Sequence, residues 1–141
     1  LDVRLAYRWL DVQTNYGGAV LQKPLVAKHR AFINLAYETN NHWKFDHTTQ
    51  WFGEKRLPNA STIANQFEVY SPSYIQMMAQ VTKQFGKTWD VYIGNENLTN
   101  YMQENRIISA NQPFSPNFDG SVVWGPINGR MFYLGLRYKI L

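Results

Sequence analysis

The dominant pattern along the chain is a strict alternation of apolar and polar residues, which has a period of two. It is clearest near the C-terminal end, where Phe132, Leu134, Leu136 and Tyr138 alternate with polar or small residues. Similar runs predict six strands, which are long beside the average of about 5–6 residues. We expect these strands near residues 3–10, 30–38, 43–51, 75–82, 89–94 and 131–140. No segment has a sustained helical period, so the pattern predicts an all-β fold.

The connections between these strands alternate in length. The segments 38–42 and 85–88 are short and contain Asn or Gly, residues that tolerate positive φ in turns. The connections 13–28, 53–73 and 100–129 are long and contain all six prolines. In an antiparallel meander, this alternation places every long loop at one end of the sheet. Transmembrane β-barrels have the same asymmetry between their two ends.

The two faces of the predicted sheet differ in character. The polar face carries mainly amide, hydroxyl and small side chains, which suits an enclosed wet lumen at least as well as open solvent. The apolar face has aromatic residues near its ends, as membrane–water interfaces favour. Trp43 and Trp51 bracket one strand, and their spacing spans roughly 20 Å along the axis of a tilted barrel. His47 is the exception, because its polar ring falls mid-strand on this predicted lipid face.

Closure of the sheet requires more strands than this sequence supplies. A membrane-spanning barrel needs at least about eight strands, because an open edge in lipid leaves backbone groups without partners. We therefore expect residues 1–141 to be part of a larger transmembrane β-barrel. Its first residues already fit the middle of a strand. Exposed strand edges would also let the isolated segment form oligomers.

Composition excludes several other classes of protein. Hydrophobic residues make up 45% of the chain, with 5 Trp, 9 Tyr and 8 Phe, which is incompatible with a disordered coil. No run approaches the 18 or so apolar residues of a membrane helix. The net charge of +4 comes from scattered basic residues, so we expect no nucleic-acid partner. The absence of cysteine excludes disulfides and thiolate chemistry.

The titratable residues do not form a recognisable catalytic or metal-binding pattern. His42 and His47 are five residues apart, so on a strand they would face opposite sides and could not share an ion. No Ser-His-Asp set or carboxylate pair recurs at a plausible spacing, and no glycine pattern typical of a phosphate site is present. We therefore expect no enzymatic activity, no bound metal and no cofactor.

Three segments together resemble a known family. These are KHRAFINL at 28–35, FGKTWDVYIGNENLTNY at 85–101 and GRMFYLGLRYKI at 129–140. They resemble the late strands of TonB-dependent outer-membrane receptors, and the residues are most similar to those of Bacteroidetes members. The resemblance covers nearly the whole chain, as the last six strands of a barrel of about 22 strands. The ending Ile140-Leu141 differs from the terminal aromatic residue that closing strands of this family usually carry.

The resemblance implies a function in active import across the bacterial outer membrane. A nutrient ligand too large for porins would bind outside, and the TonB complex would supply the energy for its passage. The plug domain and TonB-contacting region of the family are N-terminal and lie outside this sequence, and the nature of the ligand stays open. The converging long loops are the best place for binding, with five aromatic candidates that could stack on a ligand: Trp51, Phe52, Phe114, Phe118 and Trp124.

Two other functions remain open at this point. A free-standing soluble, lipocalin-like β-barrel would turn the apolar face inward around a small hydrophobic ligand, although six strands are fewer than the usual eight. A small structural or adhesin barrel of the outer membrane would need additional strands within the long loops.

Overall fold

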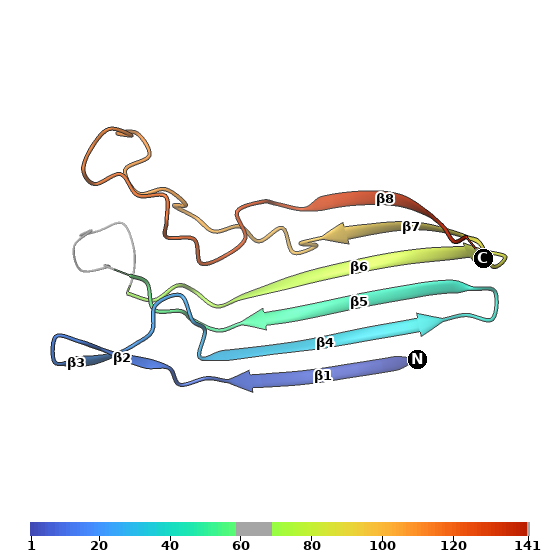
Figure 1. Ribbon diagram of the computed structural model, residues 1–141, viewed down its shortest axis with the longest axis horizontal. Helices are drawn as coiled ribbons and strands as arrows, with labels where there is room; N and C mark the ends of the chain where they lie inside the picture. Colours follow the sequence, from blue (N-terminus) through green and yellow to red (C-terminus); the bar gives the residue numbers. More distant parts are fainter. Residues whose placement is uncertain (59–68, 141) are drawn as a thin grey trace.

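The computed structural model describes residues 1–58 and 69–140, which form eight strands and no helix. Six of the strands make one antiparallel sheet in the order β1-β4-β5-β6-β7-β8 (Figure 1). Their bounds are β1 (Asp2–Trp9), β4 (His29–Glu38), β5 (Trp43–Phe52), β6 (Tyr74–Phe85), β7 (Trp89–Glu96) and β8 (Met131–Tyr138). The predicted all-β meander is thus confirmed, as an open sheet that the described strands do not close into a barrel.

The first long connection differs from the prediction because it contains a separate hairpin. β2 (Gln13–Tyr16) and β3 (Ala19–Gln22) pair with each other and not with the main sheet. Gly17 and Gly18 form the turn with φ values of 62° and 101°, which is the left-handed combination that a two-residue type I′ turn requires. The expectation of a loop at 13–28 was wrong here, because strands of four residues show too little alternation to register as a pattern.

All tight turns and all long connections lie at opposite ends of the sheet (Figure 1). The β4–β5 and β6–β7 turns are at one end, where the residue preceding β5, His42, and the glycine after β6, Gly86, both have φ of 60°. The long connections gather at the other end, which we call the loop end. The middle of the predicted 53–73 connection, residues 59–68, lies outside the described part of the chain. Among the described residues, no helix is long and apolar enough to cross a membrane.

The strand register brings the apolar positions of all six strands onto one face. In one part of the sheet Leu5 is paired with Ile33, and in another Val81 is paired with Ile93, which is in turn paired with Leu134. A slip of one residue in any pair would move a whole strand's apolar set to the other side. The sequence-based assignment of the faces therefore holds across every pair of strands.

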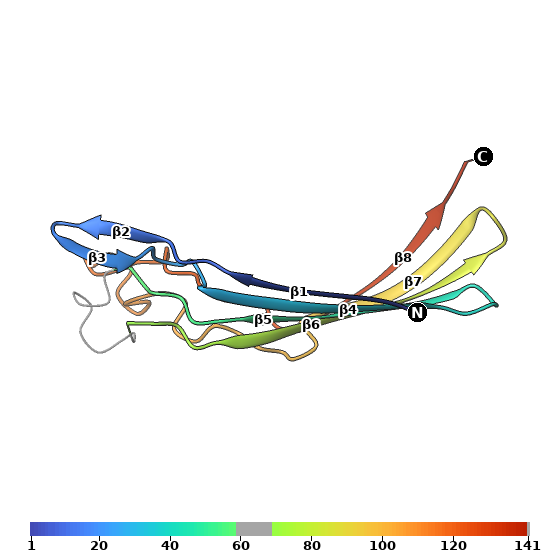
Figure 2. The ribbon, with the colours of Figure 1, turned by 90° about the horizontal axis from the view of Figure 1, so that it is seen from below.

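The sheet is curved (Figure 2), and the exposures of its side chains make the apolar face the more exposed side. On β7 the apolar-face residues Val91 and Ile93 are exposed, whereas the polar-face residues Asp90 and Gly94 are buried. This is the reverse of the arrangement in a soluble protein, where the apolar side of a sheet packs inward. The fold therefore leaves its apolar face without a covering layer within the described residues.

A cross-strand pair of tyrosines and glycines joins β7 to β8 on the polar face. Gly94 is paired with Tyr133, and Tyr92 is paired with Gly135. A Cβ on Gly94 would lie within 2.6 Å of three atoms of the Tyr133 side chain, so the hydroxyl end of that side chain lies directly over the glycine. The Tyr133 hydroxyl then donates to Oε1 of Gln80 at 3.0 Å, which ties β8 to β6 across β7. Aromatic cover of a strand glycine is a known way of restoring packing at such a position.

This arrangement predicts that Gly94→Ala destabilises the protein by about 1–2 kcal/mol, because the new methyl group displaces the Tyr133 ring and breaks its hydrogen bond. Urea titrations of the protein measure the effect. The same change in a Tyr133→Ala background is the control. There it should be neutral or stabilising, since alanine is favoured over glycine within a strand. Equal costs in both backgrounds would contradict the proposed contact.

Candidate functional site

A small hydrophobic cluster organises the loop end on the polar-face side of the sheet. We call it the loop core; its buried residues are Leu57, Tyr74, Ile108, Val122 and Trp124, with Phe52 and Tyr101 packed against them. Phe52 and Tyr74 are paired across β5 and β6 at positions that belong to the polar face. The loops therefore fold back over the polar side of the sheet and not over the apolar side.

Stacked rings form the centre of the loop core. The ring of Tyr74 lies between those of Phe52 and Tyr101, with centroids 4.8 and 4.9 Å away and interplanar angles of 15° and 3°. The guanidinium of Arg30 lies 4.4 Å from the centre of the Phe52 ring, which is a close cation–π contact. Packing of this kind fixes the direction in which the loops leave the strands.

Lys55 places a second cation against the same rings. Its ammonium lies 5.6 Å from the Phe52 ring centre and 5.4 Å from that of Tyr74, and it donates to the carbonyl of Trp124. Burial lowers the pKa of Lys55 below its usual 10.5, and the nearby Arg30 guanidinium lowers it further. The loop core thus contains a partly desolvated amine that links the connection after β5 to the connection before β8.

The lowered pKa of Lys55 gives a pH-dependence with a definite sign. Between its folded pKa and 10.5 the unfolded chain binds more protons, so Lys55 should make stability rise with pH in the range just below 10.5. Lys55→Met should remove this contribution from urea titrations carried out across that range. Burial and the nearby Glu104 raise the pKa of Tyr101, and this shift makes stability fall with pH instead. The contribution of Tyr101 is present in the parent protein and in Lys55→Met, so it cancels when the two are compared. Lys87→Met, at an exposed turn, should leave the slope unchanged.

The connection from β7 to β8 is held by two buried amides. Asn97, with φ of 54°, donates to the carbonyls of Tyr101 and Asn128, and it accepts hydrogen bonds from the Thr99 hydroxyl and the Tyr101 amide. These bonds give the ENLTN segment of the sequence a structural role as a fixed turn.

The second amide, Gln103, is 1% exposed and bridges two distant parts of the same connection. It donates to the Val122 carbonyl at 2.8 Å, and its oxygen accepts from the backbone amides of Trp124 and Gly125. Gln103 therefore joins residue 103 to residues 122–125 and closes the base of the long loop, because the buried backbone groups there are satisfied by its side chain.

The structure separates the five aromatic residues that the sequence suggested as a binding group. Phe52 and Trp124 lie together in the loop core. Trp51 is on the opposite, apolar face, where its ring stacks against His29 with centroids 6.5 Å apart. Phe114 and Phe118 lie far along the β7–β8 connection and are exposed, Phe114 completely. Of the five, these last two are the ones exposed within the long β7–β8 connection.

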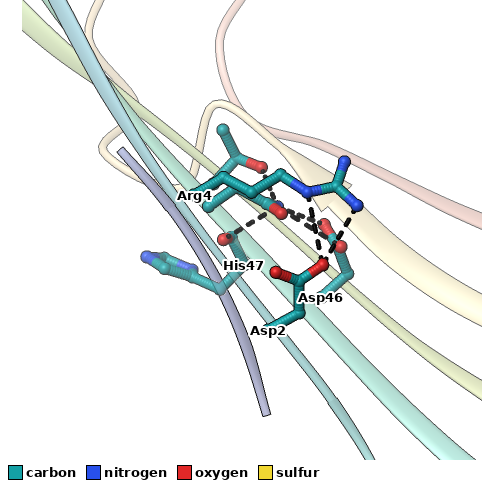
Figure 3. A network of polar contacts seen from close by, with 6 residues as sticks. Asp2, Arg4, Asp46 and His47 are labelled. Atoms are coloured by element: carbon teal, nitrogen blue, oxygen red, sulfur yellow. Dashed lines mark hydrogen bonds and ion pairs between the residues drawn. The ribbon is translucent and has the colours of Figure 1, made fainter. Parts of the chain in front are cut away.

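The polar face carries a lining of hydrogen bonds and ion pairs between neighbouring strands. Asn34 donates to Asp46 and to the Thr48 hydroxyl across β4 and β5, while the His47 ring projects to the other side (Figure 3). Asp90 is buried and forms ion pairs with Arg137 at 3.8 Å and Lys139 at 3.3 Å. The alternation of side chains along each strand places these residues on the same face, and the pairing of adjacent strands makes them neighbours, so the sequence pattern could have indicated such partners.

An open hollow of about 580 Å³ lies over this polar lining near the tight turns. Acidic and basic side chains alternate around it, including Asp2, Glu38, Lys44 and Arg137. Among the residues described, no three His, Asp or Glu side chains are grouped so as to hold a metal ion. The arrangement suits contacts with a polar surface or hydrated ligand through hydrogen bonds and ion pairs, and it holds no recognisable nucleophile with its base.

No protein-family model, curated protein or solved structure matches the chain.

Proposed function

We propose that this chain is a segment of the β-barrel of a TonB-dependent outer-membrane importer. The observation that carries the proposal is the inverted sheet, whose apolar face is the exposed one. Leu5 on β1 and Leu134 on β8 are 77% and 76% exposed, at opposite edges of the same face. Water would strongly disfavour such a surface, whereas lipid hydrocarbon would accommodate it.

The total exposed area supports the same proposal. The chain exposes 9811 Å², whereas a compact monomer of 16.5 kDa would expose about 7,600 Å². The excess is of the size expected for a surface that another layer covers. Membrane lipid is the layer that best fits a continuous apolar face on strands of 8–12 residues.

Aromatic side chains at both ends of the apolar face fit the two interfaces of a membrane. Trp43 and Phe45 stack near the tight turns, and Trp89 and Tyr138 have ring centroids 4.6 Å apart at the same end. At the loop end the rings of Tyr7, His29 and Trp51 form a second group. Aromatic girdles of this kind flank the apolar band of outer-membrane barrels.

The polar face and the free edges fit the wall of a larger barrel. The polar lining would face a wet lumen, and the unpaired edges of β1 and β8 would continue into further strands, because a sheet edge cannot face lipid. The loop end would then lie outside the cell, where the exposed Phe114 and Phe118 are candidate ligand contacts. The TonB complex and the plug would act through regions beyond this sequence.

Import by this segment requires binding and gated passage, without chemistry on the ligand. The loop core would keep the outer mouth in shape while the ligand binds. The soluble lipocalin-like alternative needs the apolar face enclosed around a ligand, and the exposure of that face favours the membrane proposal over it.

Spin labels at single introduced cysteines test the proposal in the full-length protein, since the segment itself contains no cysteine. Labels at Leu5→Cys and Leu134→Cys should collide mainly with oxygen, which dissolves in lipid. The matched labels at the polar-face positions Ala6→Cys and Ala36→Cys should collide mainly with a water-soluble nickel chelate. Reversed or equal accessibilities, or recovery of the protein in the soluble cell fraction, would overturn the membrane assignment.

Ligand import is tested separately from membrane insertion. Loss of the full-length protein, or of TonB function, should abolish growth on one nutrient too large for porins, and re-expression should restore it. A protein that resides in the outer membrane but whose loss affects no such uptake would support the small structural barrel as its function instead.

A further inference from the structure

A pocket of about 270 Å³ opens on the apolar-face side at the loop end of the sheet. His29, Trp51, Gly53 and Ser73 line it from the ends of β4, β5 and β6, at successive outward-facing positions. Gly53 allows the close approach of the strands here, since a Cβ would lie 3.0 Å from the His29 carbonyl oxygen. The pocket is thus a built concavity at the boundary between the apolar band and the loops.

The pocket presents ring faces beside groups that bind hydroxyls and anions. The rings of Trp51 and His29 are stacked at 28° to each other, and the Tyr7 hydroxyl lies 2.6 Å from His29 Nδ1. When that hydroxyl donates to Nδ1, Nε2 is the ring nitrogen that carries a hydrogen and can donate to a ligand. Aromatic faces next to hydrogen-bonding groups are the usual surroundings of a bound sugar ring.

Two charged side chains complete the chemistry of the pocket. Lys28 holds its ammonium 5.9 Å from the Trp9 ring centre and 3.7 Å from Asp11, and it keeps 41% of its side-chain surface exposed. Its remaining N–H donors suit a phosphate group. Glu54, on the pocket wall, suits the hydroxyls of a sugar instead.

We infer that this pocket binds the phosphorylated sugar headgroup of an outer-leaflet glycolipid, an inference that rests on the proposed membrane function. The position of the pocket favours a lipid over a free saccharide. The pocket opens directly above the apolar face, where Ala31 and Ile75 are paired with Trp51, so acyl chains would continue along the strands toward Leu5 and Ile33. One molecule would thereby place its sugar on rings, its phosphate on Lys28 and its chains on the apolar face.

The test uses the full-length protein in phosphatidylcholine nanodiscs that contain increasing fractions of an acylated, bisphosphorylated glucosamine disaccharide. Native mass spectrometry then measures the fraction of protein that retains one glycolipid. Lys28→Gln and Trp51→Ala should each raise the half-saturating fraction about tenfold. Lys28→Arg should retain binding. Because Lys28 is at the surface, its variants keep the test valid even if Trp51→Ala fails to fold.

Two matched controls lie at the other end of the same face. Lys83 holds its ammonium 5.2 Å from the Trp43 ring centre near the tight turns, so Lys83→Gln and Trp43→Ala make the same chemical changes there. They should alter the half-saturating fraction less than twofold. Equal losses of glycolipid binding from the variants at both ends would show a general effect of surface charge or aromatic area. That result would contradict a specific binding site at the pocket.

A soluble probe distinguishes the glycolipid from a free saccharide. Glucosamine 1-phosphate should bind at least a hundredfold more weakly than the glycolipid, since it lacks the acyl chains. Equal affinity for both would overturn the lipid assignment. Spin-label accessibilities that support the membrane, together with no effect of Lys28→Gln, would reject this inference and leave the proposed function intact. Failure of the accessibility pattern itself would reject both.

Discussion

Replacing Asn97 by alanine should lower the free energy of unfolding by about 3–5 kcal/mol, one of the two largest effects we expect in this chain. The substitution leaves the carbonyls of Tyr101 and Asn128 and the amide of Tyr101 without their partners, at a site where Asn97 is 2% exposed. A fully buried group left without a partner costs about 1–3 kcal/mol, but Tyr101 is only partly buried and Asn128 is exposed, so water replaces part of the lost hydrogen bonding. Alanine also tolerates the φ of 54° less well than asparagine does, which costs about 1–2 kcal/mol more.

Urea titration of the protein measures this loss, and hydrogen exchange in peptides covering 97–103 locates it. Asn97→Asp should cost about half as much, because it keeps the acceptor and the left-handed conformation but loses both donors. The matched control is Asn111→Ala, an exposed asparagine in the same connection, which should change stability by less than about 0.5 kcal/mol. A loss below about 1 kcal/mol for Asn97→Ala would show that the turn does not depend on this amide.

Replacing Gln103 by leucine should open the β7–β8 connection while leaving the sheet intact. Leucine has a similar size but cannot bond to the Val122 carbonyl or to the amides of Trp124 and Gly125, so three groups at a buried site lose their partner. The expected cost is about 3–6 kcal/mol, which is enough for the loop to unfold locally before the strands do.

Trypsin provides the measurement, because Arg106 is the only Lys or Arg between Lys87 and Arg130. Cleavage after Arg106 should accelerate about 100-fold or more in Gln103→Leu, since cleavage follows the population of the open loop. Gln112→Leu makes the same change at an exposed position of the connection and should leave the rate within about twofold. Equal rates in the two variants would mean that Gln103 does not order the loop.

Both predictions concern the segment that the proposed function places at the outer mouth. A loop whose interior groups are satisfied by Asn97 and Gln103 can present Phe114 and Phe118 at a fixed distance from the sheet. Binding to such a surface requires less ordering of the protein than binding to a free loop. Under the proposed function, the two amides would therefore influence ligand binding as positioning residues and not as contacts.

The sequence contained signals for the β2–β3 hairpin and for the faces of the aromatic residues, but no signal for the packing of the loop core. Gly17-Gly18 is a type I′ turn signal, but the flanking strands were too short and polar to show alternation. Trp51 and Phe52 were both predicted to belong to one binding group. They are adjacent in a strand, however, and successive strand residues face opposite sides, so the alternation alone places them on different faces. Nothing local, by contrast, indicated that Trp124 would pack on Tyr74, because fifty residues separate them and loop folding joins them.

What the sequence by itself determined is the all-β meander, the positions of the six strands of the main sheet and the identity of the apolar face, because alternation with a period of two is a local property of the chain. The tertiary structure alone decided that this apolar face is the exposed one and that the loops pack on the opposite side through Phe52 and Tyr74. Curvature of the sheet and contacts between distant loops set those features. Both arise from the packing of the whole sheet and have no counterpart in any single segment.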